Sequence, residues 1–227
     1  MSREASYKVK IKKIENVDGS ASMDILKKSV DKVIEQFNGE KSENILMDNK
    51  MEDCLFAIKF DNFPNGIGID INEKGGIQTK YETIESNQGF PEKVISSLKQ
   101  NYNRFAVEKA LRKMGYETVT EEKGNLGEGR VIIIESKKKS VPSIKTKVYE
   151  SSEKIKVDFF GFRGNECVDR EKKLRDNLLE YGIKTEVDKY RDKSEEEMNF
   201  ERGLFYKKIQ DCPENVIVNK ERVKIKS

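Results

Sequence analysis

The chain contains no histidine and no tryptophan, and it has only three cysteines and four prolines among its 227 residues. Without histidine, the Ser-His-Asp and Cys-His catalytic arrangements are excluded, and so are zinc and iron sites that need imidazole ligands. Cys54, Cys167 and Cys212 are far apart and form no CxxC pair, so we expect neither a structural zinc site nor a disulfide framework. This use of cysteine is typical of a reducing, cytoplasmic compartment.

Long apolar runs are also missing. No run of about 18 apolar residues occurs, and the N-terminal segment lacks the apolar core of a signal peptide, so we expect no membrane segment. Charged residues are abundant instead, at 37% of the chain, well above the globular average of about 25%. The 44 basic and 41 acidic residues are interspersed and leave a net charge of +3, which implies charged surfaces over small cores and no strong field for nucleic acid.

Hydrophobic patterning predicts an α+β domain over residues 1–139. An alternating strand is expected at Tyr7–Ile14, and helices are expected from Ser22 to a terminating glycine at Gly39 and over Phe90–Met114. Together with six further strands, they predict an antiparallel sheet with helices on one face, which is ferredoxin-like. These strands are predicted at Asn44–Asp48, Cys54–Phe60, Ile67–Ile71, Ile77–Thr83, Glu117–Glu122 and Arg130–Glu135.

The polar, basic stretch Ser136–Ser143, which contains a proline, predicts a domain boundary. A smaller ββα module is expected over 144–227, with a hairpin of Ile144–Glu150 and Lys154–Phe160 and a helix that begins at Asn165. An extension completes the module: a strand over 183–190, a helix over 194–209 and a hairpin of 216–218 with 223–225.

The turn that follows the last strand of this hairpin is the most distinctive motif. Gly161 and Gly164, with Arg163 between them, suit an anion-binding nest at the start of a helix. The same glycines also suit a strand-to-helix turn that needs positive φ. Phe160 or Phe162, if exposed beside the arginine, would suit an anchor for a protein contact.

Cys167 follows this turn near the positive end of the predicted helix. The helix dipole lowers the pKa of a thiol at this position and favours thiolate chemistry. The flanking acidic residues Glu166 and Asp169 oppose that effect. The alternative interpretation is a small apolar residue that packs the helix onto its strand.

Three other groups of residues have simpler interpretations. The GxG of Gly66 and Gly68 is followed by a strand instead of a helix, so it predicts a close approach of backbone and not a dinucleotide site. Scattered carboxylates are interpreted as solvated turn residues, because their spacing does not require a magnesium site: Asp48, Asp53, Asp61, Asp70 and Glu73. Five lysines suit either phosphate contacts or a solvated linker: Lys137, Lys138, Lys139, Lys145 and Lys147.

Two segments resemble small families without an assigned function. The region from Cys54 to Glu135 is similar to domain of unknown function twelve fifty-seven of bacteria and plastids, and the region Lys154–Leu179 is similar to domain of unknown function twenty-nine ninety-seven. The first resemblance rests on Tyr102, Ala106, Gly115, Tyr116 and Val131–Ile133, and the second on Gly161, Phe162, Gly164 and Cys167. Members of both families tend to be encoded beside a MoxR-like AAA-plus ATPase. No catalytic residues are established for either family, so the resemblance implies none.

These features favour a non-enzymatic adaptor or regulatory partner of an AAA-plus ATPase. It would need no cofactor or metal and would act through protein contacts of the Phe160–Arg163 turn and the Cys167 face of the helix. The alternative is a nucleic-acid- or nucleotide-binding protein of a phage or defence system, which sequesters a ligand or inhibits an enzyme. The basic stretch and the glycine turn would then carry the function. A thiol redox protein that uses Cys167 is a third hypothesis.

Overall fold

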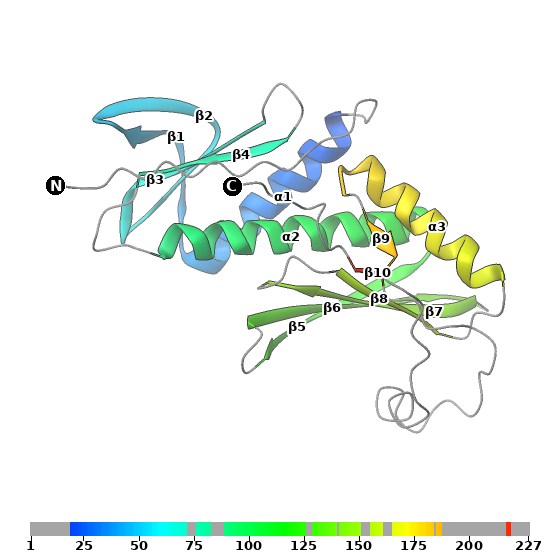
Figure 1. Ribbon diagram of the computed structural model, residues 1–227. Coiled ribbons are helices and arrows are strands. Elements are labelled where there is room, and N and C mark those ends of the chain that lie inside the picture. Colours follow the sequence, from blue (N-terminus) through cyan, green and yellow to red (C-terminus); the bar gives the residue numbers. More distant parts are fainter. Residues whose placement is uncertain are drawn as a thin grey trace. The chain divides into compact units, whose positions relative to one another are not determined.

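The computed structural model describes residues 19–71, 76–82, 89–125, 129–139, 141–150, 155–160, 165–183, 185–187 and 217–218. Within this part of the chain, two four-stranded antiparallel sheets and three α-helices confirm the predicted α+β class (Figure 1). The chain divides into two compact units. The first contains the described residues up to Ala106 together with Glu180–Ile183, and the second contains Val107–Leu179 and the described residues that follow 184. Helix α2 (Phe90–Lys113) runs without interruption through the division between the units.

The first unit contains a sheet in the order β1-β2-β3-β4, in which consecutive strands pair. The ferredoxin-like comparison therefore extends to the layering of helices on a sheet and not to the strand order. A tight turn with positive φ at Asp48 and Asn49 joins the first two strands, which suits the residue types that tolerate this conformation. The strands are β1 (Glu40–Met47), β2 (Lys50–Phe60), β3 (Phe63–Ile71) and β4 (Ile77–Lys80).

The first helix of this unit ends in a left-handed residue. Helix α1 (Gly19–Phe37) starts before the predicted Ser22, and its apolar stripe is buried as expected. The prediction that Gly39 terminates it is wrong, because Asn38 takes the left-handed conformation at φ 51° and Gly39 donates its N–H to Ile34 at 2.9 Å. Asparagine tolerates this position because its short polar side chain costs little there.

Gly39 is required for a different reason, which is the packing of aromatic rings. A Cβ atom at this position would lie 2.6 Å from Cε1 of Phe60. Phe60 meets Phe37 and Phe90 edge to face, with ring centroids 6.4 and 5.1 Å apart. Edge-to-face contacts stabilise aromatic pairs beyond the burial of their area. The cluster therefore joins the end of α1, strand β2 and the start of α2.

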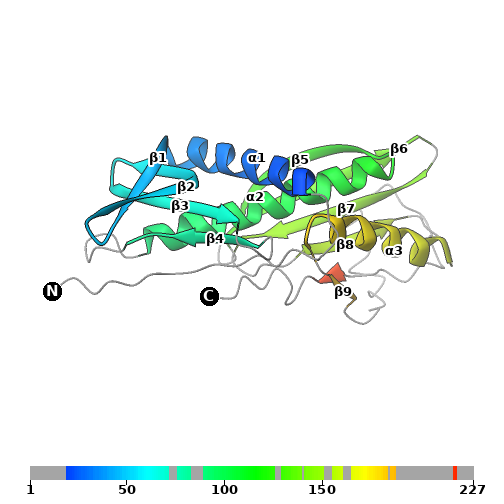
Figure 2. The same cartoon turned by 90° about the horizontal axis from the view of Figure 1, so that it is seen from above.

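The GxG pair of β3 marks a close approach of another strand, as predicted. Strand β1 contacts β3 although the two are not hydrogen-bonded neighbours, and Figure 2 views this sheet from above. Ile45 of β1 is fully buried, and its side chain fills the space over Gly66 and Gly68. Cβ atoms on these glycines would lie 3.1 and 2.9 Å from the Ile45 side chain. Glycine is therefore needed so that β1 can fold over β3.

Helix α2 also buries polar side chains in the first unit, and several of their polar atoms have hydrogen-bond partners, whereas Oδ1 of Asn101 and Oδ1 of Asn103 have none within the described residues. Ser97 donates its hydroxyl to Oε1 of Gln36 at 2.6 Å, and the amide nitrogen of Asn101 donates to the same oxygen at 3.1 Å. The Tyr102 hydroxyl donates to the main-chain oxygen of Tyr181 at 2.9 Å. Hydrogen bonds of this kind offset the cost of removing polar groups from water.

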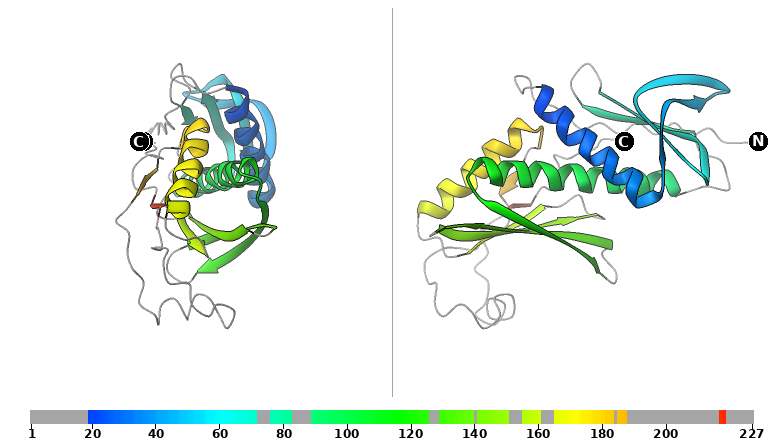
Figure 3. Two further views of the ribbon diagram at one scale, coloured as in Figure 1. Left: turned by 90° about the vertical axis from the view of Figure 1, so that its right-hand side faces the viewer. Right: turned by 180° about the vertical axis from the view of Figure 1, so that it is seen from behind.

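The second unit is a meander of four strands in the order β5-β6-β7-β8. Figure 3 shows helix α3 (Asn165–Glu180) and the C-terminal part of α2 along one face of this sheet. Helix α2 ends in a Schellman motif at Gly115, where φ is 83° and the N–H of Tyr116 donates to Leu111 at 3.0 Å. The strands are β5 (Glu117–Asn125), β6 (Gly129–Lys138), β7 (Val141–Tyr149) and β8 (Ile155–Phe160).

The predicted domain boundary at Ser136–Ser143 is wrong, and so is the division into 1–139 and 144–227. This stretch is the connection between β6 and β7, and Lys138 pairs with Val141. Pro142 lies where the register of the pair shifts, which is a position where a strand tolerates proline. Strands predicted for two domains therefore belong to one sheet.

The remaining predictions fall mainly outside the described residues. The strand at Tyr7–Ile14 and the helix over 194–209 lie there entirely. β10 (Ile217–Val218) pairs with β9 (Glu186–Val187) and not with the predicted 223–225, which lie outside the described residues. No helix in the described part of the chain is both long enough and apolar enough to span a membrane.

Candidate interaction surface

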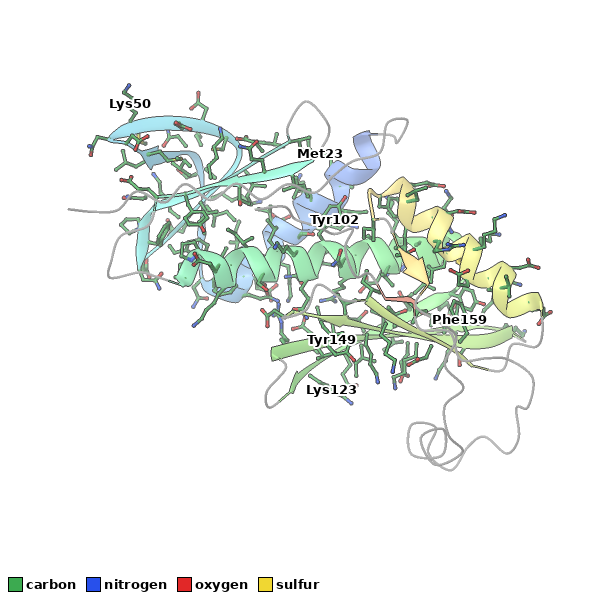
Figure 4. All side chains as sticks on the ribbon, in the orientation of Figure 1. Met23, Lys50, Tyr102, Lys123, Tyr149 and Phe159 are labelled. Carbon is green, nitrogen blue, oxygen red and sulfur yellow. The ribbon has the colours of Figure 1, made fainter. Side chains whose placement is uncertain are left out.

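The β5–β8 sheet has one packed face and one open face. On the packed face, the inward side chains of β6, β7 and β8 are almost completely buried. Ile134, Ile144 and Val157, for example, have 0% exposure. Side chains of opposite parity form the open face, here named the outer face. Figure 4 shows the side chains of both faces, with Lys123 and Phe159 labelled. The outer face includes Glu117, Val119, Glu121 and Lys123 of β5, Ile133, Glu135 and Lys137 of β6, Lys145 and Lys147 of β7, and Lys156 of β8. Val131 and Asp158 have the same parity but are only 5% and 1% exposed, so the face is open chiefly along β5 and the adjoining part of β6.

Charges on the outer face are paired across and along the strands. Glu135 and Lys145 are register partners, with a carboxylate–ammonium distance of 3.2 Å. On β5, Glu121 and Lys123 are 3.1 Å apart. Val119 lies among these groups and is 70% exposed, the largest exposure of any bulky apolar side chain in the described part of the chain. An apolar side chain among ion pairs resembles the mixed surface of a protein interface.

The five candidate lysines do not form one surface. Lys138 turns to the packed side, where its ammonium donates to the main-chain oxygen of Met114 at 3.3 Å and lies 6.0 Å from the centroid of the Tyr116 ring. It therefore neutralises the negative end of α2. Lys137, Lys145 and Lys147 are on the outer face, and Lys139 is exposed in the β6–β7 turn. A basic patch built from all five is therefore excluded.

The predicted docking turn starts at the end of β8. Phe160 pairs with Ser143, so the turn begins at the same end of the sheet as Lys138, which pairs with Val141. Gly161, Phe162, Arg163 and Gly164 lie outside the described residues, as do the side chains of Phe160 and Cys167. In the first turns of α3, Val168 is 43% exposed. The structure therefore places the backbone of Phe160 and of Lys138 at one end of the sheet.

Sequence patterns did not reveal a buried ion pair on α3. Glu171 is 2% exposed, and its carboxylate lies 2.6 Å from Nε of Arg175, one helical turn away. Burial raises the pKa of Glu171, and the charge of Arg175 opposes that rise. The spacing of Glu171 with the buried Leu174 and Leu178 places it on the apolar stripe, which is the signal that could have identified it.

The remaining candidates in the first unit have structural roles. Cys54 is half-buried, and burial, followed by the charge of Asp70, raises the pKa of its thiol to about 11. The thiol is therefore neutral near pH 7 and a poor nucleophile. Asp70 accepts the N–H of Leu55 at 2.8 Å and lies 3.1 Å from the ammonium of Lys80, which accounts for one of the carboxylates considered for magnesium.

The other carboxylates of that set are dispersed. Asp48 occupies the β1–β2 turn, Asp61 lies at the β2–β3 turn, and Glu73 lies outside the described residues. Within the described ranges, no three cysteine, aspartate or glutamate side chains are grouped so that they could hold a metal ion. Comparison of the chain with protein-family models, curated proteins and solved structures finds no match.

Proposed function

We propose that this chain is a non-enzymatic adaptor or regulatory protein that acts through protein–protein contacts of the outer face. The observation that carries the proposal is the open face of the β5–β8 sheet, where Val119 is 70% exposed among the charged side chains of β5 and β6. Interfaces combine apolar anchors with a polar rim in this way, and a sheet that is packed on its other face is a rigid support for them.

An AAA-plus ATPase of the MoxR-like type is the proposed partner. This choice follows from the resemblance expected from the sequence motifs alone, since members of the two families are encoded beside such ATPases. Phe160, the first residue of the predicted docking turn, ends β8 of the same sheet.

We prefer this function to nucleic-acid binding because the candidate lysines are divided between two faces. The ammonium of Lys138 donates to the main-chain oxygen of Met114 at the end of α2, and Lys145 forms an ion pair with Glu135. Phosphate binding needs several cations that act together and release counterions. A mobility shift with DNA or RNA that strengthens as the salt concentration falls would reverse this preference, and a depressed thiol pKa at Cys167 would favour the redox hypothesis.

The test uses the purified full-length chain and the purified ATPase encoded beside it. Binding is measured by calorimetry, and the ATP hydrolysis rate is measured with and without the chain. Val119→Asp should weaken binding at least about tenfold, because a charge would replace an exposed apolar anchor. Leu55→Asp is the matched control, since Leu55 is 45% exposed on β2 of the other unit.

Phe162→Ala provides a second arm, which examines the predicted turn. Loss of binding in Val119→Asp but not in Leu55→Asp supports the proposal. Absence of binding by the unmodified chain, or equal weakening by both aspartate variants, contradicts it.

A further inference from the structure

Strand β5 leaves one of its edges open. It pairs with β6 along its whole length and is the terminal strand of its sheet, so no strand in the described part of the chain occupies its other edge (Figure 1). Glu117, Val119 and the stretch 121–124 are exposed to solvent. An open edge presents a row of main-chain N–H and C=O groups that can pair with another strand.

The other described sheet edges are less suited to accept a strand. The pairing of β1 with β2 shifts register between Ser42 and Asn44, which marks a bulge. Strand β4 spans only Ile77–Lys80, and β8 is contacted by β10. Bulges, short strands and covering segments are the usual means by which proteins prevent pairing at an edge. β5 has none of these three features. Its one protection is a set of charged outward side chains, which restricts the partners that can pair with it.

Side chains on the packed side hold β5 in place. The Thr120 hydroxyl donates to Oε1 of Glu108 at 2.7 Å, and Nε of Arg112 donates to the Thr118 hydroxyl at 3.2 Å. Glu108 and Arg112 on α2 also approach each other, with a carboxylate–guanidinium distance of 3.6 Å. The strand is thereby fixed before any partner arrives, which lowers the entropic cost of adding a strand.

The outward side chains of β5 select the partner by charge. Glu117, Val119 and Glu121 occupy alternate positions, so the edge presents an acidic, an apolar and a second acidic group. A second copy of the strand, antiparallel and centred on Val119, would set Glu117 against Glu121 twice. Like charges directly opposite each other destabilise a strand pair, and opposite charges stabilise it. In this register a basic strand is preferred over self-association. A register centred on Glu122 would instead set Glu121 against Lys123 twice, so the test also measures dimerisation.

We propose that the open edge of β5 accepts an extended peptide as an additional antiparallel strand, in which basic residues flank an apolar residue at alternate positions. The inference rests on the proposed function, since the peptide would belong to a protein that contacts the outer face. The main-chain groups of β5 would provide affinity by hydrogen bonding to the peptide, and the side chains of Glu117, Val119 and Glu121 would provide selectivity.

The test measures binding of a labelled synthetic peptide by fluorescence anisotropy. The peptide is threonine-rich and carries lysine, valine and lysine at alternate positions. Amide hydrogen exchange of the chain then locates the site, and protection of β5 amides is expected. The double variant Glu117→Lys, Glu121→Lys should bind at least about tenfold more weakly, because two attractions become repulsions. The control is Glu35→Lys, Glu40→Lys, which reverses two exposed carboxylates of the other unit and should leave binding unchanged.

A second peptide separates strand pairing from simple charge attraction. It keeps the lysines and the valine, but prolines replace alternate threonines and remove main-chain donors. This peptide should fail to bind. Equal binding of both peptides, equal binding to both double variants, or no binding at all would overturn the inference. So would concentration-dependent dimerisation of the unmodified chain that the Glu117→Lys, Glu121→Lys variant abolishes, because a second copy would then occupy the edge. Circular dichroism and thermal unfolding verify that the variants fold.

The ATPase experiment distinguishes this inference from the proposed function. If the peptide binds and the ATPase does not, the proposed partner is wrong and the strand-addition site stands. If the ATPase binds equally to the unmodified chain and to the Glu117→Lys, Glu121→Lys variant, while the peptide does not bind, the strand-addition site is wrong and the proposed function stands.

Discussion

The substitution Gly68→Ala tests whether β1 is folded over β3. A Cβ atom at Gly68 would lie 2.9 Å from Cδ1 of Ile45 and would overlap Sγ of Cys54. Ile45 has no exposed surface through which it could move aside, so the new methyl group overfills a packed region. Overpacking of this kind costs about 1–3 kcal/mol. For a chain of this size, the expected fall in midpoint temperature is about 2–12 °C.

A double-mutant cycle identifies the contact that causes the loss. Cys54→Ala removes the overlapping sulfur, and since the thiol pKa is about 11, no charge is lost near pH 7. In the Cys54→Ala background, Gly68→Ala should cost less than it does alone, with a coupling energy of about 1 kcal/mol. The measurement is urea unfolding followed by circular dichroism. Gly124→Ala is the control, because a Cβ there would meet nothing within 4 Å. The packing described here is refuted if Gly68→Ala costs no more than this control, or if Cys54→Ala gives no rescue.

Three further substitutions have defined outcomes. Gly39→Ala sets a methyl group 2.6 Å from Phe60 and should destabilise the fold by about 1–3 kcal/mol in urea unfolding; a neutral effect would contradict the aromatic packing. Tyr102→Phe removes the hydrogen bond to Tyr181 and should cost about 0.5–1.5 kcal/mol, and a gain in stability would contradict it. Burial raises the pKa of Glu171, so ionisation of this carboxyl opposes folding. Glu171→Gln removes the ionisable group. The unfolding free energy of this variant, minus that of the unmodified chain, should therefore rise as the pH increases through that pKa. The difference should become independent of pH below about pH 3, where the carboxyl is protonated in both states. A difference that is independent of pH would show that the ionisation of Glu171 is not coupled to folding.

Local patterns in the sequence were sufficient to predict most of the secondary structure. Helix α2 ends within one residue of its predicted end at Met114, because the apolar spacing and the following Gly115 are both local signals. The β5–β6 hairpin around the glycine-rich loop was predicted for the same reason, and its glycine at 129 has a φ of 74°. The end of α1 was misassigned because Asn38 and Gly39 both tolerate the left-handed conformation.

Information about distant contacts was missing at the predicted boundary. The polar composition of Ser136–Ser143 is typical of a linker and equally of a hairpin turn, and only the pairing of Lys138 with Val141 distinguishes them. Lys138 has the parity of the buried Ile134 and Ser136, so alternation along β6 indicates its side of the sheet, but its contact with the end of α2 depends on distant packing. Likewise, the exposure of Val119 follows from the place of β5 at the edge of its sheet, and strand order is not encoded locally.

The continuity of α2 limits how this polypeptide can be dissected. A cut at the division between Ala106 and Val107 would split one helix into a longer piece and the short piece Val107–Lys113, each with buried apolar residues, such as Leu98 and Leu111, on its own side. Isolated helices shorter than about 12–15 residues are marginal in water, so the piece that begins at Val107 would lose its turns and the core that they complete. The second half therefore loses part of its core when the chain is cut at this point. Any shorter version of the polypeptide should keep Phe90–Lys113 whole.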